Sequence, residues 1–289
     1  MLKFMVVGVF QGATYGLLAV GLVLVYKGTR TFNFAQGEFG TVAAYVTYAL
    51  FANAGLPYGV AVLVGLLCAV LVGLIVERLV VRPLLNAPRL TLLVATVGVA
   101  LFIISVTIIV GQVVPRVLAP AIPGRAIYIF GAGIQPQQLL ILGALIALAA
   151  LLALFFRTTF GLAFLATSQD SLATRTVGIS VTGMSRFIWG FAALLGGIAG
   201  ILQAPASGVF QPAFMTTGAL IPAFAAAVLG GMTSLPGAFL AGEIIGVTQN
   251  MATFWLTRAG VPGSADLAVF ALLLLTLLVR PRGLLGQEA

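Results

Sequence analysis

The segment Arg157–Arg186, RTTFGLAFLATSQDSLATRTVGISVTGMSR, interrupts a chain that is otherwise strongly apolar. Within it, Ser168–Thr176 has the pattern of a short, capped, amphipathic helix. Thr167 or Ser168 can serve as its N-cap, and Asp170 places a negative charge in its first turn, where the helix end is positive. A water-exposed helix held between two membrane spans presents a shaped surface, so we expect a docking site for another protein.

The C-terminal end of this expected helix is marked as well. Arg175 falls in the last turn, and Gly178 follows as a left-handed C-cap. The residues that we expect to form or hold the docking surface are Ser168, Gln169, Asp170, Leu172, Ala173, Arg175 and Gly178.

Composition decides the class of protein. Of 289 residues, 61% are hydrophobic and 7% are charged, and the mean hydropathy is +1.20. A soluble domain carries about 25% charged residues, so most of the surface of this chain must face lipid. We therefore expect an all-α polytopic membrane protein, with a single transmembrane domain over residues 1–289. The 14 basic residues stand singly between apolar runs, which is typical of topology signals rather than of a nucleic-acid site.

Apolar runs of about 20 residues can each cross a bilayer as a helix. We expect nine spans, within a range of eight to ten, because Ala204–Pro236 could hold one full helix or two half-helices. The expected spans are Phe4–Tyr26, Phe34–Ala52, Tyr58–Val76, Leu90–Gly111, Leu139–Phe156, Phe187–Ser207, Thr217–Gly231, Ala238–Leu256 and Leu267–Val279. If Arg157–Arg186 is cytoplasmic, ten basic residues lie inside and four outside. This bias predicts an external N-terminus and a cytoplasmic C-terminus.

Glycines at a spacing of four predict close helix packing. They are Gly8, Gly12 and Gly16, Gly196 and Gly200, and Gly242 and Gly246. Internal packing is the first interpretation, and a contact face for a second membrane subunit is the alternative.

Two segments carry more polar and helix-breaking residues than packing requires, namely Asn33–Glu38 and Ala223–Glu243. Both resemble helix ends folded into the membrane, where irregular backbone is tolerated beside protein or a water-filled cavity. Ionisable groups inside a membrane are candidates for a functional role, so Glu38 and Glu243 could line a solute pathway. Each is also placed within about a turn of the cytoplasmic boundary, where it could instead simply reach water or cap a helix. Gln249 and Asn250 fall in mid-span, where they either pair across helices or line the pathway. The candidate pathway residues are Asn33, Gln36, Glu38, Glu243, Gln249 and Asn250.

Several kinds of chemistry are excluded by missing residues. The only lysines are Lys3 and Lys27, and Lys27 precedes Gly28, so the chain lacks the Lys-Ser/Thr of a phosphate-binding P-loop. Without histidine, and with Cys68 as the single cysteine, neither a catalytic triad nor a His/Cys metal site can form. We expect no enzymatic activity, no metal and no cofactor.

Taken jointly, several motifs give the chain a clear resemblance. They are Gly12–Gly21 (GATYGLLAVG), Asn33–Glu38 (NFAQGE), Glu77-Arg78 with Arg82-Pro83, Asp170 with Ala173 and Gly178-Ile179, Ala227–Gly231 (AVLGG), Ser234–Ala238 (SLPGA) and Arg280–Gly286 (RPRGLLG). Along nearly its whole length the chain resembles the permease subunits of bacterial branched-chain amino-acid ATP-binding-cassette (ABC) importers, specifically the shorter of their two permease types. It departs from the family pattern at Gln36, where histidine is usual, and at Gln169-Asp170, where a Glu-Asp pair is usual.

The resemblance implies a machine of several subunits. It consists of two related permeases, two cytoplasmic ATPases and a periplasmic or lipid-anchored solute-binding protein. Ser168–Thr176 would then be the coupling helix seated on one ATPase, and the chain would lie in the bacterial cytoplasmic membrane.

Three further hypotheses for the function stay open at this point. Permeases for urea and other small solutes are similar, so the substrate could be urea or another small solute. The chain could instead be an ion-coupled secondary transporter that uses Glu38 or Glu243. It could also be a membrane scaffold that only docks a cytoplasmic partner.

Overall fold

Helices make up almost all of the regular structure in the computed structural model, which describes residues 1–85, 87–129, 131–169, 174, 176, 178–256, 258–280 and 283–286. In chain order they are α1 (Leu2–Thr29), α2 (Gln36–Tyr48), α3 (Tyr58–Val76), α4 (Arg89–Gly111), α5 (Pro136–Phe155), α6 (Thr159–Gln169), α8 (Val181–Ala206), α9 (Ile221–Gly230), α10 (Leu235–Leu256) and α11 (Ser264–Val279). Short turns extend three of them: η1 (Ala49–Asn53) follows α2, η2 (Glu77–Val81) and η3 (Arg82–Leu84) follow α3, and η4 (Thr216–Leu220) leads into α9.

Each of the nine expected spans falls on one of these helices, so the all-α polytopic fold is confirmed. Among the described residues, five helical stretches are long and apolar enough to cross a membrane: α1, α3 with its extension to Leu84, α4, α5 and α8. Thr216–Gly230 and α11 are shorter apolar helices. The region Ala204–Pro236 therefore holds the end of α8, a loop and one short helix, rather than two half-helices.

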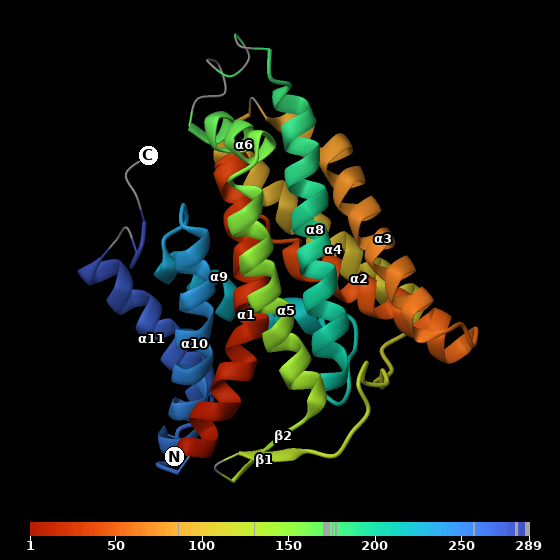
Figure 1. Cartoon of the computed structure of the whole chain (residues 1–289), viewed down its shortest axis with the longest axis vertical. Coiled ribbons are helices and arrows are strands. Elements are labelled where there is room, and N and C mark those ends of the chain that lie inside the picture. The colour runs from red at the N-terminus through yellow and green to blue at the C-terminus, as the bar shows by residue number, and fades with distance from the viewer. Residues whose placement is uncertain are drawn as a thin grey trace.

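Helix α1 forms the centre of the bundle. It runs the height of the molecule beside α5 and α10 (Figure 1), and its residues from Gly12 to Val25 are buried. The contact of α1 with α10 depends on glycine, because a methyl group added at Gly242 would lie 2.5 Å from Cα of Gly16. Helices α2 and α8 meet in the same way, since a methyl group added at Gly40 would lie 3.2 Å from Cα of Gly200. The packing interpretation of the glycine pattern is confirmed.

A small β-hairpin was not expected from the sequence. Strands β1 (Ile127–Ile129) and β2 (Ala132–Ile134) pair antiparallel, with Ile127 opposite Ile134. The hairpin lies at the same end of the bundle as the N-terminus, while α6 lies at the opposite end (Figure 1). The preceding loop is held by two backbone hydrogen bonds between Arg116 and Phe210, of 2.8 and 2.9 Å.

Candidate translocation site and coupling segment

The start of α2 lies deep inside the bundle. After α1 ends at Arg30, the chain turns back inward through buried Thr31, Asn33 and Ala35. The Gln36 side-chain amide then donates a hydrogen bond of 2.8 Å to the carbonyl of Ala192. Ala192 lies about 11 residues into α8, or roughly 16 Å from its start at 1.5 Å per residue. Glu38 follows Gln36 in the helix and is fully buried, so its side chain does not reach water in this structure.

Asn33 and Gln36 fix this inward turn. The Asn33 side-chain oxygen accepts a bond of 3.0 Å from the Ala35 backbone N–H, and its amide donates one of 3.1 Å to the Gln36 oxygen. With the bond to Ala192, the Gln36 side chain uses both its oxygen and its nitrogen, and both residues are fully buried. Gln36 thus holds the start of α2 against α8 in this chain.

Glu38 is different, because its carboxylate has no hydrogen bond of good geometry among the described residues. The side chain is fully buried. The hydroxyls of Thr41 and Thr216 lie beside the carboxylate as its nearest side-chain donors, although neither contact has good hydrogen-bond geometry. Buried polar atoms are nearly always well paired in proteins, so these four poorly paired oxygens make Glu38, Thr41 and Thr216 a candidate functional site.

Two helix starts meet at this point. A methyl group added to Gly37 would lie 2.8 Å from the Thr216 hydroxyl and 3.0 Å from the Thr216 backbone nitrogen. The beginning of α2 thus packs directly against the beginning of η4, and neither helix start has a side-chain cap. The N-terminal end of a helix carries a partial positive charge, so the Glu38 carboxylate lies where two such ends converge.

Glu243 occupies a separate place, at the contact between α1 and α10. A methyl group added at Gly12 would lie 3.0 Å from its Oε2, and both of its carboxylate oxygens are buried without a partner among the described residues. Glu243 lies about 8 residues into α10, or roughly 12 Å from its start.

Gln249 and Asn250 are paired within the protein. The Tyr15 hydroxyl donates a bond of 2.6 Å to the Gln249 side-chain oxygen and accepts one of 2.8 Å from Gln11. The Asn250 amide donates to the carbonyl of Gly246 in its own helix, at 3.0 Å. Gln249 therefore bridges α10 to α1, which favours the pairing interpretation. The same level of the bundle holds a bond of 2.7 Å from Thr14 to Gln203 of α8.

Sequence reasoning missed Gln11, Thr14, Tyr15, Gln203, Thr41 and Thr216. A signal was present for the first three, because positions 11, 14 and 15 share one face of a helix. No local sequence pattern predicts that Thr216 belongs to the site, because it comes close to Glu38 only through the contact of its helix start with Gly37.

The start of the expected coupling helix is wrong. Ser168 and Gln169 belong to the last turn of α6, and the hydroxyls of Thr167 and Ser168 bond back to the carbonyls of Ala163 and Leu165. They are therefore not N-caps. Instead, Thr158 caps α6, since its hydroxyl accepts a bond of 3.1 Å from the Gly161 backbone N–H.

The rest of the segment is described only in part, since Asp170, Leu172, Ala173 and Arg175 lie outside the described residues. Gly178 has φ +83° and is left-handed, as the C-cap pattern predicts. The Ile179 N–H donates to the carbonyl of Thr174 at 3.2 Å, which is the long bond of a Schellman motif. The segment is tied to the end of α1, because the Arg30 guanidinium donates a bond of 3.0 Å to the carbonyl of Ser168.

Among the described residues, no group of three or more His, Cys, Asp or Glu side chains could hold a metal ion. The site instead combines unsatisfied polar atoms inside an apolar helical bundle with a polar segment at one end. This is the arrangement of a membrane transport protein.

The comparisons with known proteins define the family. The chain belongs to the family described as branched-chain amino acid transport system / permease component, which matches residues 4–279. It is 31% identical to the high-affinity branched-chain amino acid transport system permease protein BraD of Pseudomonas aeruginosa, over 99% of this chain and 96% of BraD. It is 30% identical to the corresponding permease protein LivH of Escherichia coli strain K12, over 97% of this chain and 94% of LivH.

A solved structure, PsaBC from Streptococcus pneumoniae in complex with Fab, has a similar fold. The TM-score is 0.52 at 15% sequence identity, and the match covers 96% of this chain and 92% of that one. This likeness concerns the fold alone. The family is one of permeases and not of enzymes.

Proposed function

We propose that this chain is a membrane-spanning subunit of an ABC importer that carries branched-chain or similar hydrophobic amino acids across the bacterial cytoplasmic membrane. Family membership and near full-length similarity to BraD and LivH support the substrate class. Energy would come from two partner ATPases, because the chain has no P-loop lysine. A second related permease and a solute-binding protein on the outer side would complete the machine.

The main support for the proposed pathway is the poorly paired group of oxygens formed by the Glu38 carboxylate and the hydroxyls of Thr41 and Thr216. An amino-acid ammonium group has three N–H donors, and the Glu38 carboxylate with the hydroxyls of Thr41 and Thr216 offers acceptors for all three. The substrate carboxylate would in turn be favoured beside the helix starts that meet at Gly37. The site therefore matches a zwitterion.

The contact between Gly37 and Thr216 acts as a closed gate in this proposal. Because Gly37 has no room for even a methyl group, nothing can pass between the two helix starts unless α2 and η4 separate. Opening would expose the Glu38 carboxylate to the substrate. A closed gate also explains why these four oxygens are poorly paired in this state.

Coupling would reach the gate by a short route. The partner ATPase would dock on α6 and the residues up to Gly178, on the cytoplasmic face. Movement of α6 would be transmitted through the bond from Arg30 to the Ser168 carbonyl. The chain from Arg30 leads directly through Asn33 and Gln36 to the start of α2. With this face inside, the N-terminus is external and the C-terminus cytoplasmic, in agreement with the positive-inside bias.

The test is uptake by the complete machine in liposomes. The chain would be reconstituted with the permease, ATPases and binding protein encoded beside it, and uptake of radiolabelled L-leucine would be measured with and without ATP. We expect ATP-dependent uptake, with competition by isoleucine and valine and none by urea. Leucine uptake by the chain alone, driven by a pH or sodium gradient, would overturn the proposal.

A further inference from the structure

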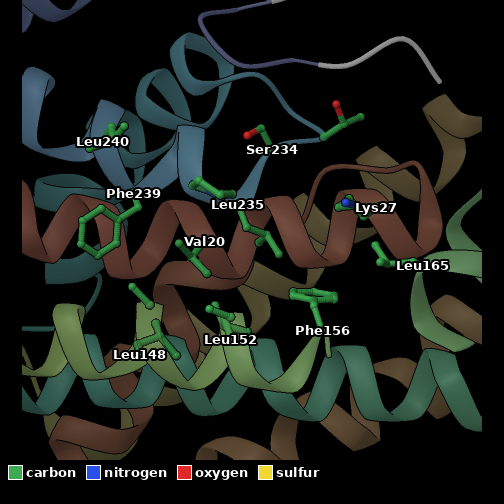
Figure 2. A pocket seen from close by; sticks show the side chains of 14 residues that line it. Val20, Lys27, Leu148, Leu152, Phe156, Leu165, Ser234, Leu235, Phe239 and Leu240 are labelled. Atoms are coloured by element: carbon green, nitrogen blue, oxygen red, sulfur yellow. The ribbon is translucent and has the colours of Figure 1, made fainter. Parts of the chain in front are cut away.

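A cavity of about 590 Å³ lies between α1, α5, α6 and the turn that joins α9 to α10. Its walls are mostly aliphatic and aromatic, with Leu148, Leu152 and Phe156 on one side and Phe239 and Leu240 on the other (Figure 2). Its volume falls in the usual range of ligand pockets, about 300–1,000 Å³. The cavity is distinct from the Glu38 site, since none of its lining residues belongs to α2 or η4.

One end of the cavity carries a positive charge. Lys27, in the last turn of α1, lines it together with Thr233 and Ser234 (Figure 2). The Lys27 side chain is half-buried, and no carboxylate among the described residues forms an ion pair with it. No lining residue is acidic. The hydroxyl of Ser234 caps the first turn of α10, so the positive end of that helix faces the same region.

The other end of the cavity is continuous with a surface that faces hydrocarbon. Leu240 on α10 is 51% exposed, and Ala153 on α5 is exposed as well, and both residues line the cavity. In a membrane-spanning bundle, apolar side chains exposed in this way contact lipid chains wherever no partner subunit covers them. An occupant that enters between α5 and α10 therefore comes from the bilayer. It meets aliphatic walls first and then, at the end of the span, the Lys27 ammonium, which has no ion-pair partner among the described residues.

From this arrangement we propose that the cavity is a binding site for one anionic phospholipid. One acyl chain lies between α5 and α10, and the phosphate is bound by Lys27 with the Thr233 and Ser234 hydroxyls beside it. Lys27 lies in the last turn of α1, a helix that spans the bundle, so its ammonium is placed at the membrane boundary. Lipid phosphates lie at the same level. This proposal does not depend on the transported solute, because lipid retention can be measured without transport.

The experiment measures lipids retained by the full chain. The purified protein is equilibrated with vesicles of phosphatidylglycerol and phosphatidylcholine in equal amounts, extracted in mild detergent, and examined by native mass spectrometry. We expect retained phosphatidylglycerol to exceed phosphatidylcholine by roughly fivefold or more, as one Lys side chain near the membrane surface confers. Lys27→Gln should remove this preference. The matched control is Arg89→Gln, an exposed basic residue at the start of α4, which should leave it unchanged.

Two further measurements keep the proposal testable if Lys27→Gln folds poorly. Ala149→Leu narrows the cavity without changing charge, and it should reduce retention of phosphatidylglycerol several-fold. Inorganic phosphate, which has no acyl chain, should not compete at millimolar concentration. Equal retention of the two lipids by the unaltered chain, or full competition by inorganic phosphate, would overturn the proposal.

Discussion

Replacement of Gly242 by alanine tests the packing on which the bundle depends. The new methyl group would lie 2.5 Å from both Cα and N of Gly16, and these are backbone atoms that cannot rotate away. Ordinary van der Waals contact begins near 3.4 Å, so α1 and α10 must separate by about 1 Å. Because α1 is the most central helix, this shift would disturb its packing along most of its length.

The size of the effect follows from matched controls. Gly143 in α5 and Gly98 in α4 have no heavy atom within 4 Å of an added methyl group. Glycine to alanine raises helix propensity equally at all three positions, so the difference between variants isolates the collision. Overpacking typically costs about 1–3 kcal/mol, which corresponds to an apparent Tm lowered by roughly 2–6 °C in a chain of this size. Gly190→Ala should lie between, because its nearest neighbour, at 3.2 Å, is the flexible end of Leu74.

The measurement is thermal unfolding of each detergent-purified variant, followed by tryptophan fluorescence under identical conditions. We expect the order Gly98→Ala and Gly143→Ala, then Gly190→Ala, then Gly242→Ala, from the highest Tm to the lowest. A Tm for Gly242→Ala within about 1 °C of the Gly143→Ala value would refute the close contact of α1 with α10.

Three other outcomes are expected. Glu38→Gln should lower leucine uptake by the assembled transporter while leaving the Tm equal or higher, because an amide costs less to bury than a poorly paired carboxylate. Normal uptake with a lower Tm would instead indicate that Glu38 is a structural residue. Glu243→Gln gives the parallel measurement at the α1–α10 contact. Leu172→Pro should abolish co-purification of the ATPases without preventing membrane insertion, because proline costs about 3 kcal/mol inside a helix, whereas unchanged co-purification and uptake would reject the coupling role. The topology can be tested with single cysteines at two exposed positions, Thr159→Cys and Ile122→Cys, in a Cys68→Ser background. The two cysteines should react with a membrane-impermeant thiol reagent from opposite sides of the membrane. Labelling of both from the same side would contradict the proposed topology.

The sequence predicted the helices well because their signal is composition over about 20 residues, which tertiary contacts do not override. The expected span Tyr58–Val76 and the observed α3 coincide. Other helix ends differ from the expected ones. Helix α8 begins at Val181 rather than at Phe187, because the Ser180 hydroxyl caps it by accepting a hydrogen bond of 3.1 Å from the Gly183 N–H. The hairpin at Ile127–Ile134 is too short to give a periodic signal.

The candidate site was predicted less completely, since the burial of a polar side chain inside the bundle depends on tertiary contacts. Glu38 follows a basic cluster in the chain, so the sequence placed it near the surface. The structure buries it because the chain between Arg30 and Gln36 folds back between α1 and α8, where Gly21 leaves space for the Gln36 amide. The candidate polar residues therefore divide into paired ones, such as Gln249, and poorly paired ones, such as Glu38.

That division bears on mechanism, because stability alone does not favour a poorly paired carboxylate. Glutamine at position 38 would fill the same volume with a smaller cost of burial, and valine at Thr216 would leave no poorly paired hydroxyl. Buried groups that weaken a fold persist where another state of the protein uses them. In the proposed mechanism this second state is one in which α2 and η4 separate and Glu38 meets a ligand. Arg30, which joins the end of α1 to the carbonyl of Ser168, is the residue through which force on α6 would reach that gate.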